Sequence, residues 1–177
     1  MKKLSLKELN RVDTATFKVQ SKAPFVLVLD NIRSAHNVGA TFRTADAFGI
    51  EKVVLCGITA QPPHREILKT AIGATDSVEW QYEKDIVVAL QQLKAENYTI
   101  VGVEQTTESV SLETVDVEQY GHYALVLGNE VSGMSDDALP LLDQAVEVPQ
   151  FGTKHSLNVS VCLGIVLWEY FRQWKYN

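Results

Sequence analysis

The chain has 177 residues, a length that fits one domain with a single core, and its formal net charge of −6 taken alone argues against a nucleic-acid partner. Its longest nearly apolar stretch, Val159 to Trp168, is far shorter than the roughly 20 residues that span a bilayer. Its two cysteines, Cys56 and Cys162, favour neither a disulfide framework nor a zinc site, so we expect a soluble cytoplasmic protein without a metal.

The first 22 residues form a basic arm that precedes the main domain, residues 23–177. The arm holds six lysines and arginines against two acidic residues, a charge of +4, which leaves 10 basic and 20 acidic side chains, or −10, for the rest. The arm is either a nucleic-acid binding segment or a solubilising tail, and charge alone leaves both open. Within it, Ser5 and Glu8 have the spacing of a capping box, which predicts a short first helix.

One continuous apolar run and three similar, mainly apolar runs of strand length predict parallel strands that helices cover on both faces. They are residues 25–29, 52–56, 99–103 and 123–127. Helical periods lie between and after them, at 38–48, at about 85–96 and at about 156–174, the first of which ends before Gly49. This alternation predicts an α/β domain with a mainly parallel, Rossmann-like sheet, whose ligand site lies beyond the carboxyl ends of the strands.

The loop after the first predicted strand contains two candidate site residues. We expect Asn37 to cap the helix that starts near Val38, and Arg43 to project from the early turns of that helix, where it is well placed to hold a phosphate. Each also has a purely structural interpretation, since Asn37 is an ordinary capping residue and Arg43 an ordinary solvated helix residue. Viewed singly, neither residue decides between these interpretations.

Two later loops also combine glycine with polar side chains. In the loop 128–134, Gly128 and Gly133 let the backbone approach a ligand closely, while Glu130 places a carboxylate in the turn. In the loop 148–160, Ser156 is expected to cap the last helix. Capping explains Asn158 poorly, because it is a second polar residue near the start of an otherwise apolar helix.

Together the three loops resemble the SpoU family, also called TrmH, within the SPOUT class of methyltransferases. The motif N-x-G-x-x-x-R-[ST]-A appears as residues 37–45, the L-G-x-E-x-x-G type as 127–133, and the I-P-M-x-G-x-x-x-S-L-N-V-S type as 148–160. The resemblance covers nearly the whole chain, from about Pro24 to Gln173. Val148 replaces the usual isoleucine and Gln150 the usual methionine, which puts the fine packing around the cofactor in doubt.

The resemblance implies a fold, a cofactor and an assembly. The C-terminal segment of the family threads through a loop to make a deep trefoil knot, a rare exception among folds. In the family, S-adenosylmethionine lies bent in the knot and is held largely by backbone groups. The matching positions in this sequence are Gly128, Val148 and Leu157, and Val103 and Glu104 are expected as extra contacts. The apolar face of the last helix, which includes Trp168 and Phe171, is expected to form a homodimer interface; without the family it would be interpreted as core.

The resemblance also implies a reaction, in which a ribose 2′-hydroxyl displaces the methyl group and S-adenosylhomocysteine leaves. The residue matching Arg43 activates the hydroxyl with help from an RNA phosphate; because arginine stays protonated, we assign it to activation or electrostatic orientation. Glu130 is expected to orient the guanidinium of Arg43. The other catalytic candidates, which shape the site, are Asn37, Ser156 and Asn158. The reaction needs no metal. His36 and His155 are weaker candidates for the base, because neither matches a fixed family position.

The RNA partner is less closely specified than the reaction. We expect transfer RNA in preference to ribosomal RNA, because compact members without an added RNA-binding domain often act on it. The alternative is an RNA-binding or assembly protein that keeps the fold but has lost catalysis. An oxidoreductase is disfavoured, since the loop after the first strand contains no glycine from 30 to 37. The residues expected to bind RNA are Lys2, Lys3, Lys7, Arg11, Arg33 and Arg43.

Overall fold

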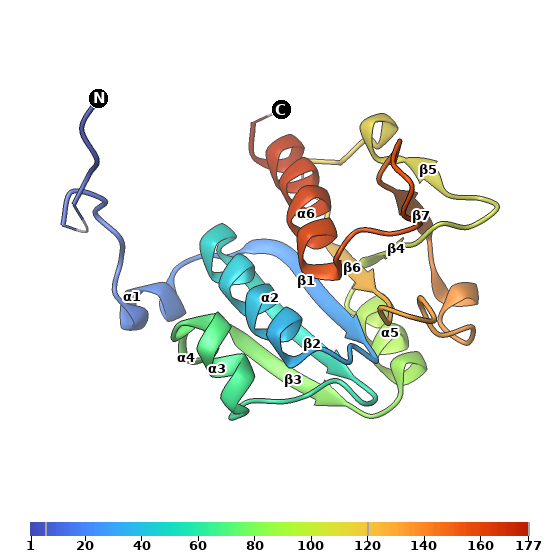
Figure 1. Cartoon of the computed structure of the whole chain (residues 1–177), viewed down its shortest axis with the longest axis horizontal. Coiled ribbons are helices and arrows are strands. Elements are labelled where there is room, and N and C mark those ends of the chain that lie inside the picture. Colours follow the sequence, from blue (N-terminus) through green and yellow to red (C-terminus); the bar gives the residue numbers. More distant parts are fainter. Residues whose placement is uncertain (6, 120, 177) are drawn as a thin grey trace.

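The computed structural model describes residues 1–5, 7–119 and 121–176, and its centre is a sheet of seven parallel strands. The strand order is β3-β2-β1-β6-β4-β7-β5, as Figure 1 shows. The strands are β1 (Ala23–Asp30), β2 (Ile50–Cys56), β3 (Glu79–Glu83), β4 (Thr99–Val103), β5 (Val110–Ser111), β6 (Tyr123–Leu127) and β7 (Gln144–Glu147). The predicted α/β class with a Rossmann-like parallel sheet is therefore confirmed.

The four predicted strands are all present, and β4 and β6 have the predicted bounds. Their side chains are almost entirely buried because helices cover both faces of the sheet, which produces continuous apolar runs. The strands β3 and β5 were not predicted from the sequence, and of β7 only its end before Val148 was expected. They are short and largely half-buried or exposed, so their sequences mix polar and apolar residues.

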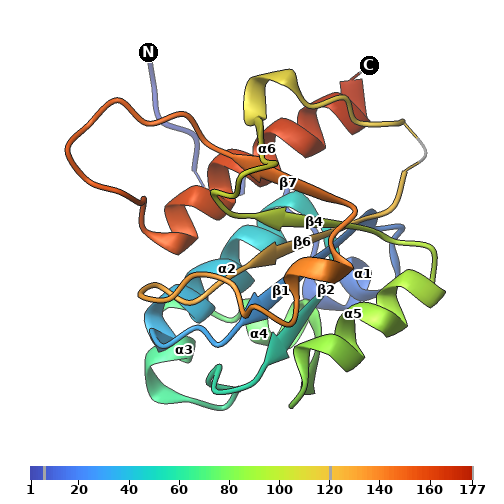
Figure 2. The same ribbon diagram turned by 90° about the vertical axis from the view of Figure 1, so that its right-hand side faces the viewer.

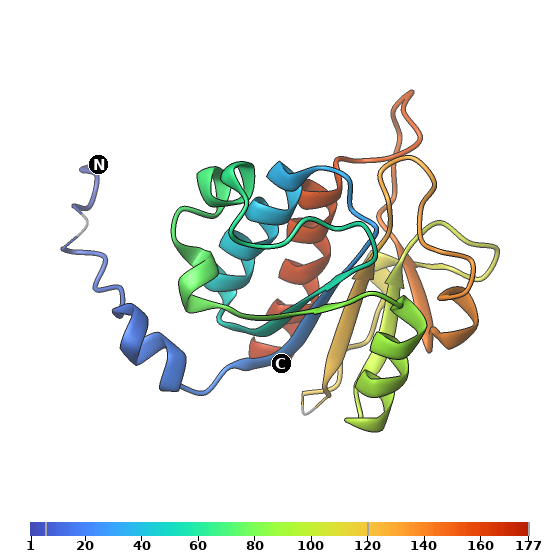
Figure 3. The same cartoon turned by 90° about the horizontal axis from the view of Figure 1, so that it is seen from below.

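The helices divide between the two faces of the sheet, as Figure 3 shows. Phe25, Leu27 and Leu29 of β1 point into the core that α2 and α6 cover, while Val26 and Val28 point into the core that α5 covers. The α-helices are α1 (Thr14–Val19), α2 (Ala35–Phe48), α3 (Arg65–Ala71), α4 (Ala74–Ser77), α5 (Ile86–Ala95) and α6 (Val159–Tyr176), and short 3-10 turns lie at η1 (Leu112–Thr114) and η2 (Leu139–Leu141).

The capping residues predicted for α2 and α6 are both wrong. The α2 helix begins earlier than expected, and Ser34 rather than Asn37 caps it by accepting from the Asn37 amide at 3.3 Å. The α6 helix begins later than expected, at Val159, and the Asn158 side chain rather than Ser156 accepts from the first amides of the helix. The left-handed end of α2 at Gly49, with φ of 62°, is confirmed.

The arm forms a turn where a helix was predicted. Glu8 accepts hydrogen bonds from the Ser5 amide and hydroxyl at 2.7 and 2.6 Å, but residues 7–10 form a turn and Leu6 lies outside the described residues. The first helix is α1, which Asp13 caps. Phe17 of α1 joins the core, while the described residues before it, 1–5 and 7–16, are exposed and extend away from the sheet in Figure 1.

The C-terminal segment returns from β7 to pack α6 beside α2. Gln173 of α6 accepts from the Val117 amide and donates to the Val115 carbonyl, both at 3.1 Å, which ties the end of the helix to the segment before β6. The trefoil knot stays a prediction. In the described part of the chain, no helix is long and apolar enough to cross a membrane.

Candidate active site

Glu130 connects two of the motif loops at the carboxyl edge of the sheet. Its carboxylate accepts hydrogen bonds from the Arg33 and Ser34 amides at 2.9 and 3.1 Å and from the Asn37 side chain at 3.0 Å. These amides precede α2, where free N–H groups and the helix dipole favour an anion. Burial raises the pKa of the Glu130 carboxyl, but hydrogen bonds from these amides and from Asn37 outweigh it and hold the pKa below its usual value.

Asn37 extends this network to the third loop. Its side-chain oxygen accepts from the Asn158 amide nitrogen at 3.2 Å and lies 3.5 Å from the Ser160 hydroxyl. The side chains of Glu130, Asn37 and Asn158 therefore form a chain of contacts, which we call the loop cluster. The structure thus brings together three of the five predicted catalytic residues, one from each motif.

A second layer of polar residues, beneath the loop cluster, was not predicted from the sequence. Asp30, only 1% exposed, accepts from the Ser135 amide at 2.7 Å and from the Asn31 side chain at 2.8 Å. The Asn129 side chain donates to the Asn31 carbonyl at 2.7 Å and accepts from the Val131 amide at 2.9 Å. These contacts fix the turn that contains Glu130. The signal for them in the sequence was Asp30, an acidic residue directly after the apolar run 25–29.

Three of the residues predicted to hold the cofactor lie at neighbouring strand ends. Val103 at the end of β4 is in register with Leu127 of β6, which precedes Gly128. A side chain at Gly128 is excluded, because its Cβ would lie 2.2 Å from the Met134 nitrogen. Glu104 accepts from that same Met134 amide at 2.9 Å. The strand ends and the turn after β6 are therefore packed closely against each other.

The other two predicted cofactor residues belong to the loop before α6. Val148 lines an apolar cavity of about 550 Å³, which does not include Val103, Glu104, Gly128 or Leu157. Leu157 lies in the exposed segment 151–158, which projects from the body in Figure 2. The residues around this cavity are Leu112, Glu113, Val148, Pro149, Val161, Gly164, Ile165, Trp168 and Glu169.

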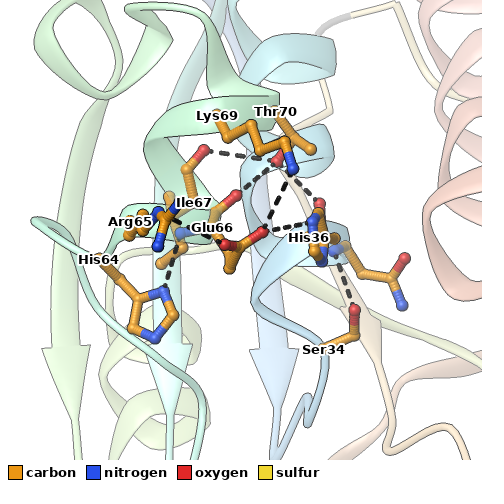
Figure 4. Close-up of polar contacts among 9 residues, drawn as sticks. Ser34, His36, His64, Arg65, Glu66, Ile67, Lys69 and Thr70 are labelled. Carbon is orange, nitrogen blue, oxygen red and sulfur yellow. Dashed lines mark hydrogen bonds and ion pairs between the residues drawn. The ribbon is translucent and has the colours of Figure 1, made fainter.

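Ser156 and His155 are exposed in the same segment, and the structure gives Ser156 no hydrogen bond within the described residues. His36, the other candidate base, lies at the start of α2 with its Nε2 atom 2.6 Å from the Glu66 carboxylate of α3, as Figure 4 shows. Among the described residues, no group of three or more His, Cys, Asp or Glu side chains is arranged to hold a metal ion.

Arg43 lies apart from the loop cluster. It is exposed in the middle of α2, six residues beyond Asn37, and six residues at 3.6 per turn place the two side chains on different sides of the helix. It lines a groove of about 900 Å³ together with Lys22, Asp46 and Lys175. The expected hydrogen bond from its guanidinium to Glu130 is not found among the described residues, because the Glu130 carboxylate binds the amides before α2 instead.

The predicted RNA-binding residues are all exposed but are widely spread. Arg11 lines the same groove as Arg43, whereas Lys2, Lys3 and Lys7 lie in the extended part of the arm. Arg33 lies at the rim of the loop cluster, because its own amide donates to Glu130.

Comparisons with known proteins support the resemblance. The model of the SpoU rRNA Methylase family matches residues 24–168. The 23S rRNA (guanosine-2'-O-)-methyltransferase RlmB of Neisseria meningitidis is 35% identical over 153 residues, which cover 86% of this chain and 60% of that protein. RlmB of Escherichia coli K12 is 33% identical over 150 residues, covering 85% of this chain and 60% of that protein. The chain thus spans less than two thirds of the length of these relatives.

Solved structures show the same fold. An AdoMet-bound rRNA methyltransferase from Sinorhizobium meliloti superposes with a TM-score of 0.80 at 25% identity, covering 89% of this chain and 59% of that one. The TrmH/SpoU tRNA modifying enzyme of A. aeolicus superposes with a TM-score of 0.78 at 28% identity, covering 90% of this chain and 79% of that one.

Proposed function

Because the chain belongs to the SpoU rRNA methylase family, we propose that it transfers the methyl group of S-adenosylmethionine to a ribose 2′-hydroxyl of RNA. The observation that carries the proposal is the loop cluster, in which Glu130, Asn37 and Asn158 join the three motif loops at one edge of the sheet. The RlmB relatives, named as guanosine-2'-O-methyltransferases, support the reaction type. A catalytically inactive RNA-binding protein would not need these three side chains together.

The proposed cofactor fits the residues at the strand ends. Gly128 and Val103 lie at adjacent strand ends, beyond which ligands of parallel sheets bind. We assign Val103, Glu104, Gly128, Val148 and Leu157 to S-adenosylmethionine, which supplies an electrophilic methyl group. The AdoMet-bound structure of the Sinorhizobium meliloti relative supports this assignment.

The polar residues of the site are assigned separate roles in positioning the loops and binding RNA. Glu130 acts as a positioning residue, because its carboxylate accepts from two backbone amides and from Asn37, and its lowered pKa keeps it ionised. Asn37 and Asn158 hold the loops that surround the reacting ribose. Arg43 keeps its proton, so we assign it to binding an RNA phosphate and to stabilising negative charge that develops on the ribose oxygen. Because Arg43 lies apart from the loop cluster of its own chain, this role requires the ribose to meet Arg43 of a second protomer.

Ribosomal RNA is the proposed substrate, in place of the transfer RNA expected from the sequence. The relatives at 33 and 35% identity are named as 23S rRNA enzymes, whereas the tRNA modifying neighbour is 28% identical. A cytoplasmic location follows from that substrate. The test is transfer of a tritiated methyl group to in-vitro transcribed 23S rRNA and to transfer RNA. Labelling of 23S rRNA supports the proposal, labelling of transfer RNA alone reverses the choice of substrate, and no labelling of either favours the inactive alternative.

A homodimer is proposed because most of the apolar face predicted for α6 is exposed, although Phe171 of that face packs against Phe48 and the core. Val161, Ile165 and Trp168 are 53, 40 and 47% exposed, while a different face, with Leu163, Val166, Leu167 and Tyr170, is buried in the core. Aromatic and aliphatic side chains gathered on one exposed helix face are typical of a protein interface. Light scattering at micromolar concentration should give twice the chain mass, and Trp168→Glu should give the monomer mass. A wild-type monomer would contradict the proposal.

A further inference from the structure

Helix α3 and the start of α2 together form an exposed basic surface beside the loop cluster. It consists of Arg33, His36, His64, Arg65 and Lys69, and we call it the α3 patch. The Arg65 and Lys69 side chains are 94 and 70% exposed, and His36 is 53% exposed. These side chains are far more accessible than Lys52, whose side chain is 15% exposed beside Glu96.

The α3 patch has a fixed position because α3 packs directly on the first turns of α2. A Cβ at Gly39 would lie 2.0 Å from the Thr70 hydroxyl and 2.4 Å from the Ile67 carbonyl oxygen, so only glycine permits this approach. The Thr70 hydroxyl lies 3.1 Å from the His36 carbonyl oxygen, and Ile67 is fully buried. Figure 4 shows His36, Ile67 and Thr70 together with Ser34, which caps α2.

The charge of the α3 patch remains positive after its acidic neighbours are counted. Glu66 lies among the cations, with its carboxylate 2.6 Å from His36 Nε2, 3.9 Å from Lys69 Nζ and 4.0 Å from Arg65 Nε. Glu130 also borders the patch, because its carboxylate accepts from the Arg33 amide. Three permanent cations, counting Arg33, therefore face two carboxylates, and the two histidines add charge only when protonated. By contrast, residues 95–153 contain no lysine or arginine.

We propose that the α3 patch binds phosphates of the RNA strand that flanks the target nucleotide. The inference rests on the proposed function, which places the target ribose at the loop cluster. Arg33 and His36 connect the two regions, since Arg33 donates its amide to Glu130 and His36 precedes Asn37 in α2. An RNA strand that leaves the loop cluster on this side meets exposed cations, and phosphate contacts of this kind position RNA without reading its sequence.

The first test removes charge from the α3 patch. In the double variant Arg65→Gln/Lys69→Gln, affinity for the 23S rRNA transcript should fall by about fivefold in 0.1 M salt for each phosphate that is no longer bound, and the salt dependence should become flatter. The control is Lys94→Gln in the last turn of α5, which covers the opposite face of the sheet, and it should leave affinity unchanged. Equal affinity of the α3 double variant and the control variant would overturn the proposal.

The second test separates phosphate binding from a structural role. Glu66→Gln removes the carboxylate that competes with phosphate for His36, Arg65 and Lys69, so RNA affinity should rise and its salt dependence should steepen. If Glu66 only anchors α3 to α2, the same change should weaken RNA binding or leave it unchanged. Either of those outcomes, in a variant with normal thermal unfolding, contradicts the proposal.

Methyl transfer distinguishes failure of this inference from failure of the proposed function. Arg65→Gln/Lys69→Gln should raise the RNA concentration needed for half-maximal rate and keep the single-turnover rate at saturating RNA. If the wild-type protein methylates RNA and the variant binds it normally, the α3 patch is wrongly assigned and the proposed function stands. If the wild-type protein methylates no RNA, the proposed function fails, and the affinity comparison still decides the role of the α3 patch.

Discussion

Asn37 and Arg43 lie six residues apart on α2 but in opposite surroundings. The side chain of Asn37 donates to Glu130 and accepts from Asn158, so it is fixed from two loops. The guanidinium of Arg43 is exposed in a groove with other basic side chains. One helix thus presents a rigid, hydrogen-bonded end and an exposed cation that can meet a ligand. The two regions should respond differently to mutation, the first through stability and the second through methyl transfer.

The largest expected effect is on the exposed cation. Arg43→Ala should lower single-turnover methyl transfer by roughly 10²- to 10³-fold, the usual loss when one group that stabilises developing charge is removed. Binding of S-adenosylmethionine, measured by calorimetry, and thermal unfolding should change little. Arg43→Lys should fail almost as badly, because an ammonium lacks the planar fork of a guanidinium. Loss of cofactor binding in Arg43→Ala would show that the groove and the cofactor site are not separate.

The next effect concerns the rigid end of α2, where α3 packs on it. Gly39→Ala should lower the free energy of unfolding by about 1–3 kcal/mol, because the added methyl would overlap the Thr70 hydroxyl and the Ile67 carbonyl. Gly164→Ala in α6 is the control, since a Cβ there meets no atom within 4 Å in the chain. Urea unfolding measures both variants. Equal stability of the two would mean that α3 is not held against α2 as described.

A smaller effect is expected at Glu130. Glu130→Ala should cost about 1 kcal/mol of unfolding free energy, because the amides before α2 lose a charged acceptor that is partly open to solvent. The exposed Glu108, changed to alanine, is the control.

The same carboxylate predicts a pH dependence. Its folded-state pKa is lowered, so its contribution is present above the unfolded-state value, near 4.5, and is lost as the pH falls through the folded-state value. The stability difference between wild type and Glu130→Ala should therefore shrink below about pH 4.5. A difference that persists unchanged into acid would contradict the assigned role of the carboxylate.

The smallest effect should come from the arm, whose cations extend from the body. Charge reversal at Lys2, Lys3, Lys7 and Arg11 should weaken RNA binding by about fivefold in 0.1 M salt for each phosphate that the arm no longer binds, and it should flatten the salt dependence. The rate at saturating RNA should be kept. If the arm variant loses turnover at saturation while Arg43→Ala keeps it, RNA docking and catalysis have been assigned to the wrong residues.

The sequence predicted the convergence of the loops better than their contacts. Carboxyl ends of parallel strands meet at one edge of a sheet, so Asn37, Glu130 and Asn158 were expected together, and their hydrogen bonds confirm it. Most partners of Glu130 are backbone amides, which a motif does not reveal. The sequence pattern predicted that Asn37 caps α2. In the structure the Asn37 side chain binds Glu130 and Asn158 instead, and Ser34 caps the helix.

The rest of the surface depends on packing that single segments do not encode. Arg65 and Lys69 lie in a segment with only modest net charge, and the α3 patch exists because Gly39 lets α3 approach α2. The apolar face predicted for α6 was ambiguous between core and interface. The structure shows that the core uses a different face together with Phe171, which leaves Val161, Ile165 and Trp168 exposed.

The most direct test of the proposed function is the position of the transferred methyl group. Wild-type protein and Arg43→Ala are incubated with S-adenosylmethionine and 23S rRNA, and the RNA is then hydrolysed in alkali, which cleaves only next to a free 2′-hydroxyl. We predict one alkali-resistant dinucleotide that carries the methyl group with the wild-type protein and none with Arg43→Ala. A methyl group recovered on a base, or an equal yield from both proteins, would contradict the proposed function.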